Sequence, residues 1–265
     1  MKQNILKALP GDHPWQSHIY WYESLDSTNT FAKKQAADGA PHGTVILADH
    51  QSAGRGRLGR SFDSPAASGI YMSLILRPDC RPDRLMHLTC AVAVAMCHAV
   101  EKVCGFRPGI KWINDLVAGG KKLAGILTEL GLNPKTGTVD YAIIGIGINC
   151  NQKPEDFPPE LRSIACSAQM VSGKPADRAK LAAVMIQELE TMSRTLENKD
   201  GILRQYRADC VTLGQEVRVL RGETCREGRA LDVDADGGLT VRFADGTLET
   251  VNSGEVSVRG MFGYA

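Results

Sequence analysis

Residues 54–60 read Gly-Arg-Gly-Arg-Leu-Gly-Arg, so that three arginines alternate with three glycines. Glycine lets the backbone turn tightly and approach a ligand closely, and each guanidinium offers a planar fork of donors that suits phosphate or carboxylate. The segment is therefore a candidate anion-binding loop. The same composition also suits a solvated turn or a nucleic-acid contact, so the surrounding sequence has to separate these interpretations.

Four further motifs accompany this loop. Asp-Ser-Thr-Asn at residues 26–29 precedes it and leads into a helical pattern. Downstream come Lys-Trp-Ile-Asn-Asp at 111–115, Lys-Lys-Leu-Ala-Gly-Ile-Leu at 121–127 and Gly-Ile-Gly-Ile-Asn at 145–149. The spacing of these three suits loops at the ends of strands. The last motif lacks the third glycine of a dinucleotide-binding fingerprint and no helix follows it at once, so it does not predict a Rossmann fold.

Together the motifs resemble the catalytic core of biotin protein ligases, and the resemblance runs from about Ile19 to the C-terminus. The family usually has proline where this chain has Ile113, which relaxes a constraint on φ but removes no polar group. The resemblance implies an α+β fold. It consists of a mixed or antiparallel sheet flanked by helices, of the class II synthetase-like type, over residues 1–211. A small SH3-like β-barrel is expected over residues 212–265.

The composition is that of an ordinary globular protein with one large domain and one small one. The chain has 265 residues, of which 43% are hydrophobic and 23% charged. A formal net charge of +1 argues against a general nucleic-acid or anionic-membrane binder. Residues 211–265 carry 6 Lys+Arg and 9 Asp+Glu, a balance of −3. The positive charge therefore lies with the arginine loop, where an anionic substrate would need it.

The eight cysteines predict a reduced, cytoplasmic protein. They include no Cys-x-x-Cys pair, and no secretory signal or membrane-spanning apolar run is present. Cys90, Cys97 and Cys104 are seven residues apart in a helical pattern, so we expect a buried structural stripe and no metal site. The segment before Ile19 is too short for the N-terminal DNA-binding domain that repressor-type relatives carry, which favours the single-function ligase.

Apolar and β-branched runs predict strands at residues 19–22, 44–48, 70–76, 110–112, 123–130 and 141–148. Helical patterns predict helices at 28–37, 84–103, 176–197 and 202–210, the first capped by Asp26 or Ser27. Residues 1–18, interrupted by Pro10-Gly11 and Pro14, are expected to be irregular. Short alternating strands at 217–220, 229–233, 239–243 and 248–251, joined by Asp-Gly and Gly-Gly turns, indicate the small barrel.

The reaction that the resemblance implies uses biotin, ATP and the Mg²⁺ that enters with ATP. The biotin carboxylate attacks the α-phosphate to give biotinyl-adenylate, and a lysine of a biotin carboxyl carrier protein or domain then takes the acyl group and releases AMP. Two unit charges about 4 Å apart repel by about 1 kcal/mol in water and about 4 kcal/mol at an effective dielectric of about 20. The first step therefore needs fixed cations, which Arg55, Arg57, Arg60 and Lys122 can supply.

The resemblance also assigns a biotin pocket, with hydroxyl and amide groups that can serve a neutral ureido ring. From sequence alone, helix capping is the favoured interpretation of Ser27 and Thr28, and Gln51 suits an exposed loop. The biotin-binding residues that the resemblance implies are Ser27, Thr28, Asn29, Gln51, Gly54, Arg55, Gly56 and Lys122.

For ATP and the adenylate, the resemblance implies Arg57, Arg60, Phe62, Asn114 and Asn149. Lys122, Arg57 and Asp115 are the expected catalytic residues, with Lys121 a solvated neighbour and Trp112 a wall. A lysine of pKa about 10.4 is poorly deprotonated by a carboxylate of pKa about 3.9, so Asp115 could equally orient the acceptor lysine or contact Mg²⁺. The arginine loop is expected to close over biotin and ATP.

Two other interpretations remain open at this point. Lipoate ligases and octanoyltransferases share the fold, but they lack the loop at residues 54–60, and their Arg-Arg-x-x-Gly-Gly-Gly stretch is absent here. A non-catalytic nucleic-acid-binding module is disfavoured by the acidic balance and the lack of interleaved aromatics on the barrel strands. The expected partner is thus a carrier protein, with no nucleic acid and no membrane. The oligomeric state is not fixed by sequence, and a homodimer is one option.

Overall fold

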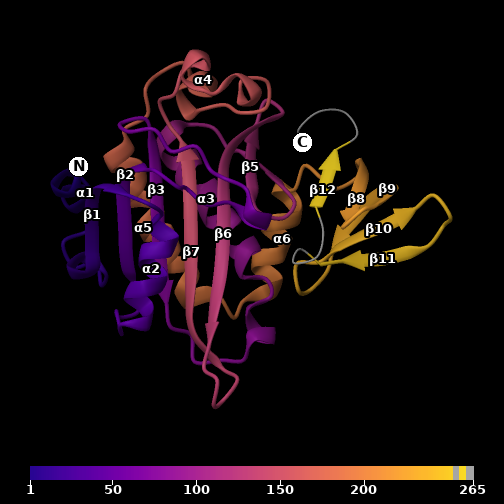
Figure 1. Cartoon of the computed structure of the whole chain (residues 1–265), viewed down its shortest axis with the longest axis horizontal. Coiled ribbons are helices and arrows are strands. Elements are labelled where there is room, and N and C mark those ends of the chain that lie inside the picture. The colour runs from indigo at the N-terminus through magenta and orange to yellow at the C-terminus, as the bar shows by residue number, and fades with distance from the viewer. Residues whose placement is uncertain (253–256, 261–265) are drawn as a thin grey trace.

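The computed structural model describes residues 1–252 and 257–260. Its larger part is built on a seven-stranded sheet in the order β1-β2-β3-β7-β6-β5-β4 (Figure 1). β1 and β2 are parallel and all other neighbouring pairs are antiparallel, so the sheet is mixed, as expected. The strands are β1 (Ile19–Leu25), β2 (Thr44–Gln51), β3 (Gly69–Leu76), β4 (Gly109–Lys111), β5 (Asp115–Ala118), β6 (Lys121–Leu132) and β7 (Val139–Asn149).

Helices cover both faces of this sheet. The helices are α1 (Lys2–Ala8), α2 (Thr28–Ala37), α3 (Leu88–Cys104), α4 (Ala168–Ser172), α5 (Arg178–Thr195) and α6 (Lys199–Asp209), with 3-10 turns at Gln16–His18, Arg57–Gly59, Pro82–Leu85, Pro154–Asp156 and Pro159–Leu161. α2 packs Ala32 and Ala36 on Ile46, Ile75 and Ile143 of one face. α3 and α5 lie behind the sheet, on the face that forms the main core (Figure 1). The α2 face is therefore the less covered one.

The second sheet confirms the expected SH3-like part. It contains β8 (Glu216–Arg221), β9 (Thr224–Val233), β10 (Leu239–Phe243), β11 (Leu248–Val251) and β12 (Ser257–Gly260), in the order β11-β10-β9-β8-β12, with all pairs antiparallel. The alternation of buried and exposed residues along β8 and β10 matches a sheet with one face in a core. The division of the chain at residues 211 and 212 remains our proposal.

The predicted strands and helices are present, and the differences are at short elements. Residues 1–18 are not irregular, because Lys2–Ala8 precedes the first breaker and forms α1, which buries Ile5 and packs on α5. β5, α4 and β12 were not predicted; elements of four or five residues carry a weak periodic signal, although β10 and β11 of the same length were predicted. β9 begins at Thr224, ahead of the predicted residue 229.

The predicted cysteine stripe of α3 is buried. Cys90, Cys97 and Cys104 all lie in the main core, and burial raises the pKa of each thiol. Within the described residues one segment, Pro82–Cys104, is long and apolar enough to cross a membrane, but 72% of its most apolar 18-residue stretch is buried inside the protein. This is the position of a core helix, packed against β6 and α5.

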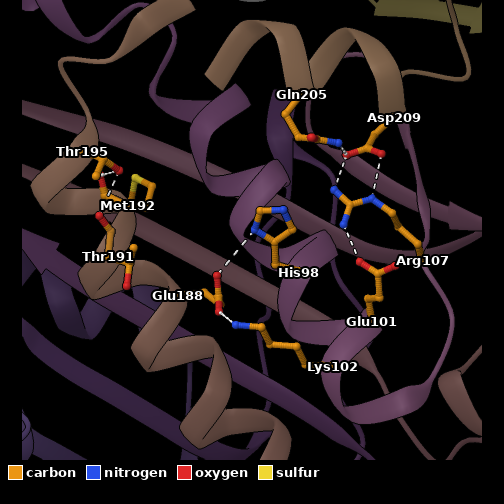
Figure 2. A network of polar contacts seen from close by, with 10 residues as sticks. All are labelled: His98, Glu101, Lys102, Arg107, Glu188, Thr191, Met192, Thr195, Gln205 and Asp209. Atoms are coloured by element: carbon orange, nitrogen blue, oxygen red, sulfur yellow. Dashed lines mark hydrogen bonds and ion pairs between the residues drawn. The ribbon is translucent and has the colours of Figure 1, made fainter. Parts of the chain in front are cut away.

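Ion pairs fasten the helices behind the sheet to one another (Figure 2). Arg107, just before β4, binds Glu101 at the end of α3 and both oxygens of Asp209 at the end of α6, at 2.6–2.8 Å. Glu188 of α5 accepts from Lys102 Nζ at 2.6 Å and lies 3.5 Å from His98 Nδ1. The Arg107 contacts hold the base of β4, the strand that leads into the Lys-Trp-Ile-Asn-Asp motif.

Candidate active site

A cavity of about 750 Å³ opens on the α2 side of the large sheet. Among the described residues, six basic side chains and one carboxylate, Asp115, line it, so the cavity is strongly cationic. The basic residues are Arg55, Arg57, Arg60, Lys111, Lys122 and Arg218. Of the predicted site residues, Ser27, Thr28, Asn29, Gln51, Arg55, Gly56, Arg57, Arg60, Phe62, Asn114, Asp115 and Lys122 line the cavity, while Gly54 and Asn149 do not.

Glycines form the floor of the cavity because the sheet register brings them together. Gly125 of β6 pairs with Gly147 of β7. Two residues further along the same pair of strands, Leu127 pairs with Gly145. A Cβ on Gly145 would lie 2.0 Å from Asn29 Oδ1, and one on Gly147 would lie 2.5 Å from the Phe62 ring. These two glycines therefore make room for the chain's own side chains, and both also line the cavity.

The N-terminus of α2 carries the predicted hydroxyl and amide cluster. Ser27 is the N-cap residue, and its side chain accepts from Thr30 N, so the capping interpretation of Ser27 is correct as well. Gln51 is not a plain loop residue, because its Oε1 accepts from Thr28 N at 2.8 Å and from Thr28 Oγ1 at 3.1 Å. Buried Ser73 of β3 lies 2.8 Å from Thr28 Oγ1 and 2.6 Å from Asn29 Oδ1. Ser73 was missed, since nothing in its apolar strand distinguishes it.

Asn29 and Arg55 meet at a carboxylate that the sequence analysis also missed. Glu129 of β6 accepts from Asn29 Nδ2 at 3.1 Å and takes both ends of the Arg55 guanidinium, each at 3.1 Å. The only signal in the sequence was an acidic residue inside an apolar strand, Ile-Leu-Thr-Glu-Leu at 126–130. The Arg55 side chain is thus engaged with the protein itself.

The arginine loop forms a small hairpin over the cavity. Gly56 N donates to Arg60 O, and Phe62 N donates to Gly54 O. A Cβ on Gly54 would lie 2.3 Å from Phe62 O, so Gly54 serves the close approach of the two arms. Leu58 and Gly59 at the tip have φ of 54° and 73°. The prediction that the loop closes on ligands stays a prediction.

Arg57 reaches deepest into the site from this loop. Its Nη1 donates to Asn114 Oδ1 at 2.8 Å, while Asn114 Nδ2 donates to Ile126 O at 3.0 Å. Burial lowers the pKa of Arg57, and the nearby Asp115 carboxylate opposes that shift. The guanidinium remains charged at neutral pH, so Arg57 places a fixed cation beside the Asn114–Asp115 turn.

Lys122 reaches the cavity through a bulge in β6. Leu116 pairs with Ala124 and Val117 with Lys122, so Leu123 is the extra residue. Leu123 and Ala124 both enter the main core, whereas Lys122 Nζ binds Asp115 Oδ1 at 2.8 Å and lies 6.0 Å from the Phe62 ring centre. Ile164 O accepts from Lys122 N, and Cys166 N donates to Lys122 O. The backbone at Lys122 is therefore fixed by hydrogen bonds to the segment at residues 164–166.

Asn149 lies apart from the cluster. Its Nδ2 donates to Cys166 O at 3.0 Å, and its Oδ1 accepts from Gln152 Nε2 at 3.3 Å. The amide nitrogen therefore supports the segment that holds Lys122, and the amide oxygen binds the nearby Gln152. Asn149 is the one predicted nucleotide contact that the structure does not bring to the cavity, and its role in binding the nucleotide stays a prediction.

The smaller sheet takes part in the site. Arg218 of β8 lines the cavity, and Trp112 Nε1 donates to Gly237 O at 2.9 Å. Trp112 N donates to Thr212 Oγ1, and the buried Tyr206 hydroxyl donates to Ile113 O at 3.2 Å. The Trp112–Ile113 peptide bond is cis. Sequence reasoning gave no role to Arg218, which is far from every motif in the chain.

Comparison with known proteins agrees with this geometry. Residues 21–149 match the biotin/lipoate A/B protein ligase family, and residues 212–259 match the biotin protein ligase C-terminal domain. The chain is 35% identical over 243 residues to the bifunctional ligase/repressor BirA of Bacillus subtilis, covering 91% of this chain and 74% of that protein.

Two further relatives point the same way. The biotin--[acetyl-CoA-carboxylase] ligase of Mycobacterium tuberculosis is 34% identical over 237 residues, which cover 87% of this chain and 85% of that protein. The biotin protein ligase from Aquifex aeolicus, solved in complex with biotin and ATP, superimposes with a TM-score of 0.77 at 28% identity, over 92% of this chain and 99% of that one. The chain described here belongs to the biotin protein ligase family.

Proposed function

We propose that this protein activates biotin with ATP as biotinyl-5′-adenylate and transfers the biotinyl group to a lysine of a biotin carboxyl carrier protein or domain. The observation that carries the proposal is the lining of the cavity, whose six basic side chains, among the described residues, outnumber the two carboxylates that pair with them, Asp115 with Lys122 and Glu129 with Arg55. Two anionic substrates can react there only if fixed positive charge offsets their repulsion. The family membership and the relatives named above support the same reaction.

The two ends of the lining suit different parts of the substrates. Ser27, Thr28 and Gln51 offer uncharged donors and acceptors, which fit a neutral ureido ring. Arg60, Lys111 and Arg218 offer charged donors, which fit a polyphosphate. Lys122 and Arg57 lie with Asn114 and Asp115 around one turn, and we assign them to the reacting carboxylate and α-phosphate.

In the first step, a carboxylate oxygen of biotin forms a bond to the α-phosphorus, and the bond to the bridging oxygen of the β-phosphate breaks. Pyrophosphate leaves with the bonding electron pair. Lys122 and Arg57 stabilise the negative charge on the α-phosphoryl oxygens as it develops. Mg²⁺ enters as part of the substrate Mg-ATP and neutralises phosphate charge. Asp115, the lining carboxylate, is the side chain suited to contact it.

In the second step, the neutral amine of the carrier lysine attacks the acyl carbon, AMP leaves, and the amine proton is lost to a base or to water. Asp115 is a candidate to orient the incoming amine. Its carboxylate is already paired with Lys122, so the two residues act as one unit in both steps. We further propose that the protein works in the cytoplasm, in keeping with its eight free cysteines.

The test is incubation of the purified protein with labelled biotin, Mg-ATP and a biotin carrier domain. Label on the carrier lysine, with AMP and pyrophosphate as products, is the expected result. Parallel reactions with octanoate and lipoate distinguish the related ligases of the same fold. Failure to form any biotinyl-adenylate or pyrophosphate would overturn the proposal.

A further inference from the structure

We propose that Glu129 is a positioning residue of this site, which orients Asn29 in the cavity floor and anchors the arginine loop over the cavity through Arg55. The inference rests on the proposed function, because it concerns how the acyl-adenylate is retained. It adds a carboxylate from the middle of β6 that belongs to none of the motifs.

Glu129 projects to the cavity side of the sheet. Ile126 of β6 packs in the main core and Thr128 bonds Thr89 of α3, so Gly125, Leu127 and Glu129 alternate on the opposite face. The neighbour of Glu129 across the strands is Ile143, an apolar residue. The Glu129 side chain is 20% exposed. A carboxylate largely removed from water at an apolar position is costly unless its oxygens are paired.

Both oxygens of Glu129 are paired. Oε1 accepts from Arg55 Nη2 at 3.1 Å, and Oε2 accepts from Arg55 Nη1 and Asn29 Nδ2, each at 3.1 Å. The contact with Arg55 is a two-pronged fork, which fixes direction as well as distance. One carboxylate therefore joins a floor residue to a loop residue 26 positions away along the chain.

The first consequence concerns Asn29. An ionised carboxylate accepts hydrogen bonds and cannot donate them, so it keeps the amide nitrogen of Asn29 turned toward β6. The amide oxygen then faces the hydroxyl of Ser73 at 2.6 Å. Asn29 fills the space above Gly145, and its amide can turn only if these contacts break. Glu129 thus determines which way the Asn29 amide points in the part of the cavity that we assign to biotin.

The second consequence concerns the loop. Its contacts with the sheet include two arginines: Arg55 on Glu129 and Arg57 on Asn114. The Arg57 contact is at the reacting centre, whereas the Arg55 contact is at the floor. Loop docking and floor geometry are coupled because they share the Glu129 carboxylate. Loss of the fork should shorten the time that the loop stays over the cavity, and an enclosed acyl-adenylate would escape more easily.

The test replaces Glu129 with glutamine, which keeps the size and one acceptor but removes the charge and the fork. In single-turnover reactions without carrier, the E129Q protein should release biotinyl-adenylate roughly tenfold faster than wild type, as expected for loss of a charge-assisted contact. Trypsin cleavage after Arg57, followed by mass spectrometry, should also accelerate with and without ligands. E129D, which keeps the charge on a shorter stem, should lie between the two proteins.

Two comparisons separate this role from a general loss of stability. Glu188, 13% exposed and paired with Lys102 and His98 behind the sheet, is a matched carboxylate remote from the cavity (Figure 2). E188Q should leave adenylate release and cleavage after Arg57 at wild-type rates. The double variant R55Q/E129Q should release adenylate no faster than the faster single variant, because the two residues form one contact.

Wild-type retention and cleavage rates in E129Q would overturn the inference, as would additive effects in R55Q/E129Q. The proposed function fails separately, if wild-type protein makes no biotinyl-adenylate. The cleavage assay needs no catalysis, so the anchoring role of Glu129 would still be decided in that case.

Discussion

At the level of single residues, Lys122 and Asp115 form the ion pair to which we assign the chemistry of the site. The two side chains come from neighbouring strands, and Nζ lies 2.8 Å from Oδ1. Gly125 faces the cavity. If side chains alternated strictly from Gly125 back to Lys122, Lys122 would face the core, but the extra residue Leu123 in the bulge turns it to the cavity side. The adjacent Lys121 points elsewhere, and its Nζ donates a hydrogen bond to Arg162 O. Two consecutive lysines thus have different surroundings.

Replacement of Lys122 by alanine should slow adenylation by roughly 10²-fold, the usual cost of removing one donor aimed at developing negative charge. Pyrophosphate release in the presence of biotin and Mg-ATP measures this directly. The matched variant Lys121→Ala should keep wild-type adenylation. Equal losses in both variants would show that the effect is not specific to Lys122.

Replacement of Asp115 by asparagine should impair both half-reactions, because the substitution also removes the charged partner of Lys122. We expect adenylation to fall by about tenfold, the value of a charge-assisted contact of about 1.5 kcal/mol. Transfer should be measured separately, by supplying preformed biotinyl-adenylate and carrier. Intact adenylation with lost transfer would contradict this expectation and assign Asp115 to the acceptor lysine alone.

At the scale of elements, the site depends on the register of the sheet and the start of α2. β3, β6 and β7 place Ser73, Leu127 and Gly145 in one row, and Tyr71, Gly125 and Gly147 in the next. α2 begins at Thr28 because Ser27 caps it, and this delivers Asn29 onto Gly145. The cavity is therefore a gap in the side-chain layer of the sheet, filled at two points by Asn29 and Phe62.

Gly145→Ala should displace Asn29, since the added methyl would lie 2.0 Å from Asn29 Oδ1. Overpacking of this kind costs about 1–3 kcal/mol, and biotin affinity should fall with it. Thermal unfolding and biotin titration calorimetry measure the two effects. Gly11→Ala is the matched control, because no atom lies within 4 Å of its added methyl and its φ is not positive. Unchanged stability and affinity in Gly145→Ala would refute the proposed packing.

At the scale of the whole molecule, the smaller sheet completes the cavity. Arg218 reaches it from β8, and Gly237 O accepts from Trp112, two residues before Asn114. Arg207 of α6 also donates to Val233 O, across the same junction. The second sheet is therefore part of the site as well as an attached domain.

Arg218→Ala should raise the KM for ATP by roughly tenfold with a smaller change in kcat, because the residue is assigned to the polyphosphate and not to the reacting atoms. Steady-state kinetics with saturating biotin measure this split. Arg242→Ala, an exposed arginine of β10 that does not line the cavity, is the control. A fall in kcat at unchanged KM would move Arg218 to the reacting centre.

Folding stability should fall as the pH drops below about 6.5. Burial lowers the pKa values of His13, His42 and His87 below the ordinary value, so in this range the unfolded chain binds more protons than the folded one. Their contribution is complete above pH 6.5 and is lost as the pH falls through the folded pKa values. Thermal unfolding between pH 5 and pH 8 tests the sign, and a Tm that rises on acidification would contradict it. His87→Gln keeps a donor for Leu196 O and should flatten the slope.

Much of the site could be predicted from sequence, because its motifs are short and continuous. The loop at residues 54–60, the cap of α2 and the Lys122 motif are each recognisable within a few consecutive residues, although the side chains that Arg55 and Arg57 bind lie far away in the chain. Strands and helices followed from apolar periodicity for the same reason. Short elements such as β5 and α1 carry few turns or alternations and were missed, although β10 and β11, flanked by turn residues, were recognised.

The sequence by itself determined the family, the mixed sheet with its small second domain, and the identity of most cationic residues. Tertiary structure alone decided which of them share one cavity. The register of β6 against β7 brings glycines together, a bulge turns Lys122 outward, and chain folding adds Ser73, Glu129 and Arg218 from outside every motif. Asn149, whose motif pointed to the nucleotide, is bonded instead to the segment behind Lys122. Contacts between residues far apart in the chain depend on strand register, which the hydrophobic patterns and turns of neighbouring strands set jointly, so one short motif does not specify it.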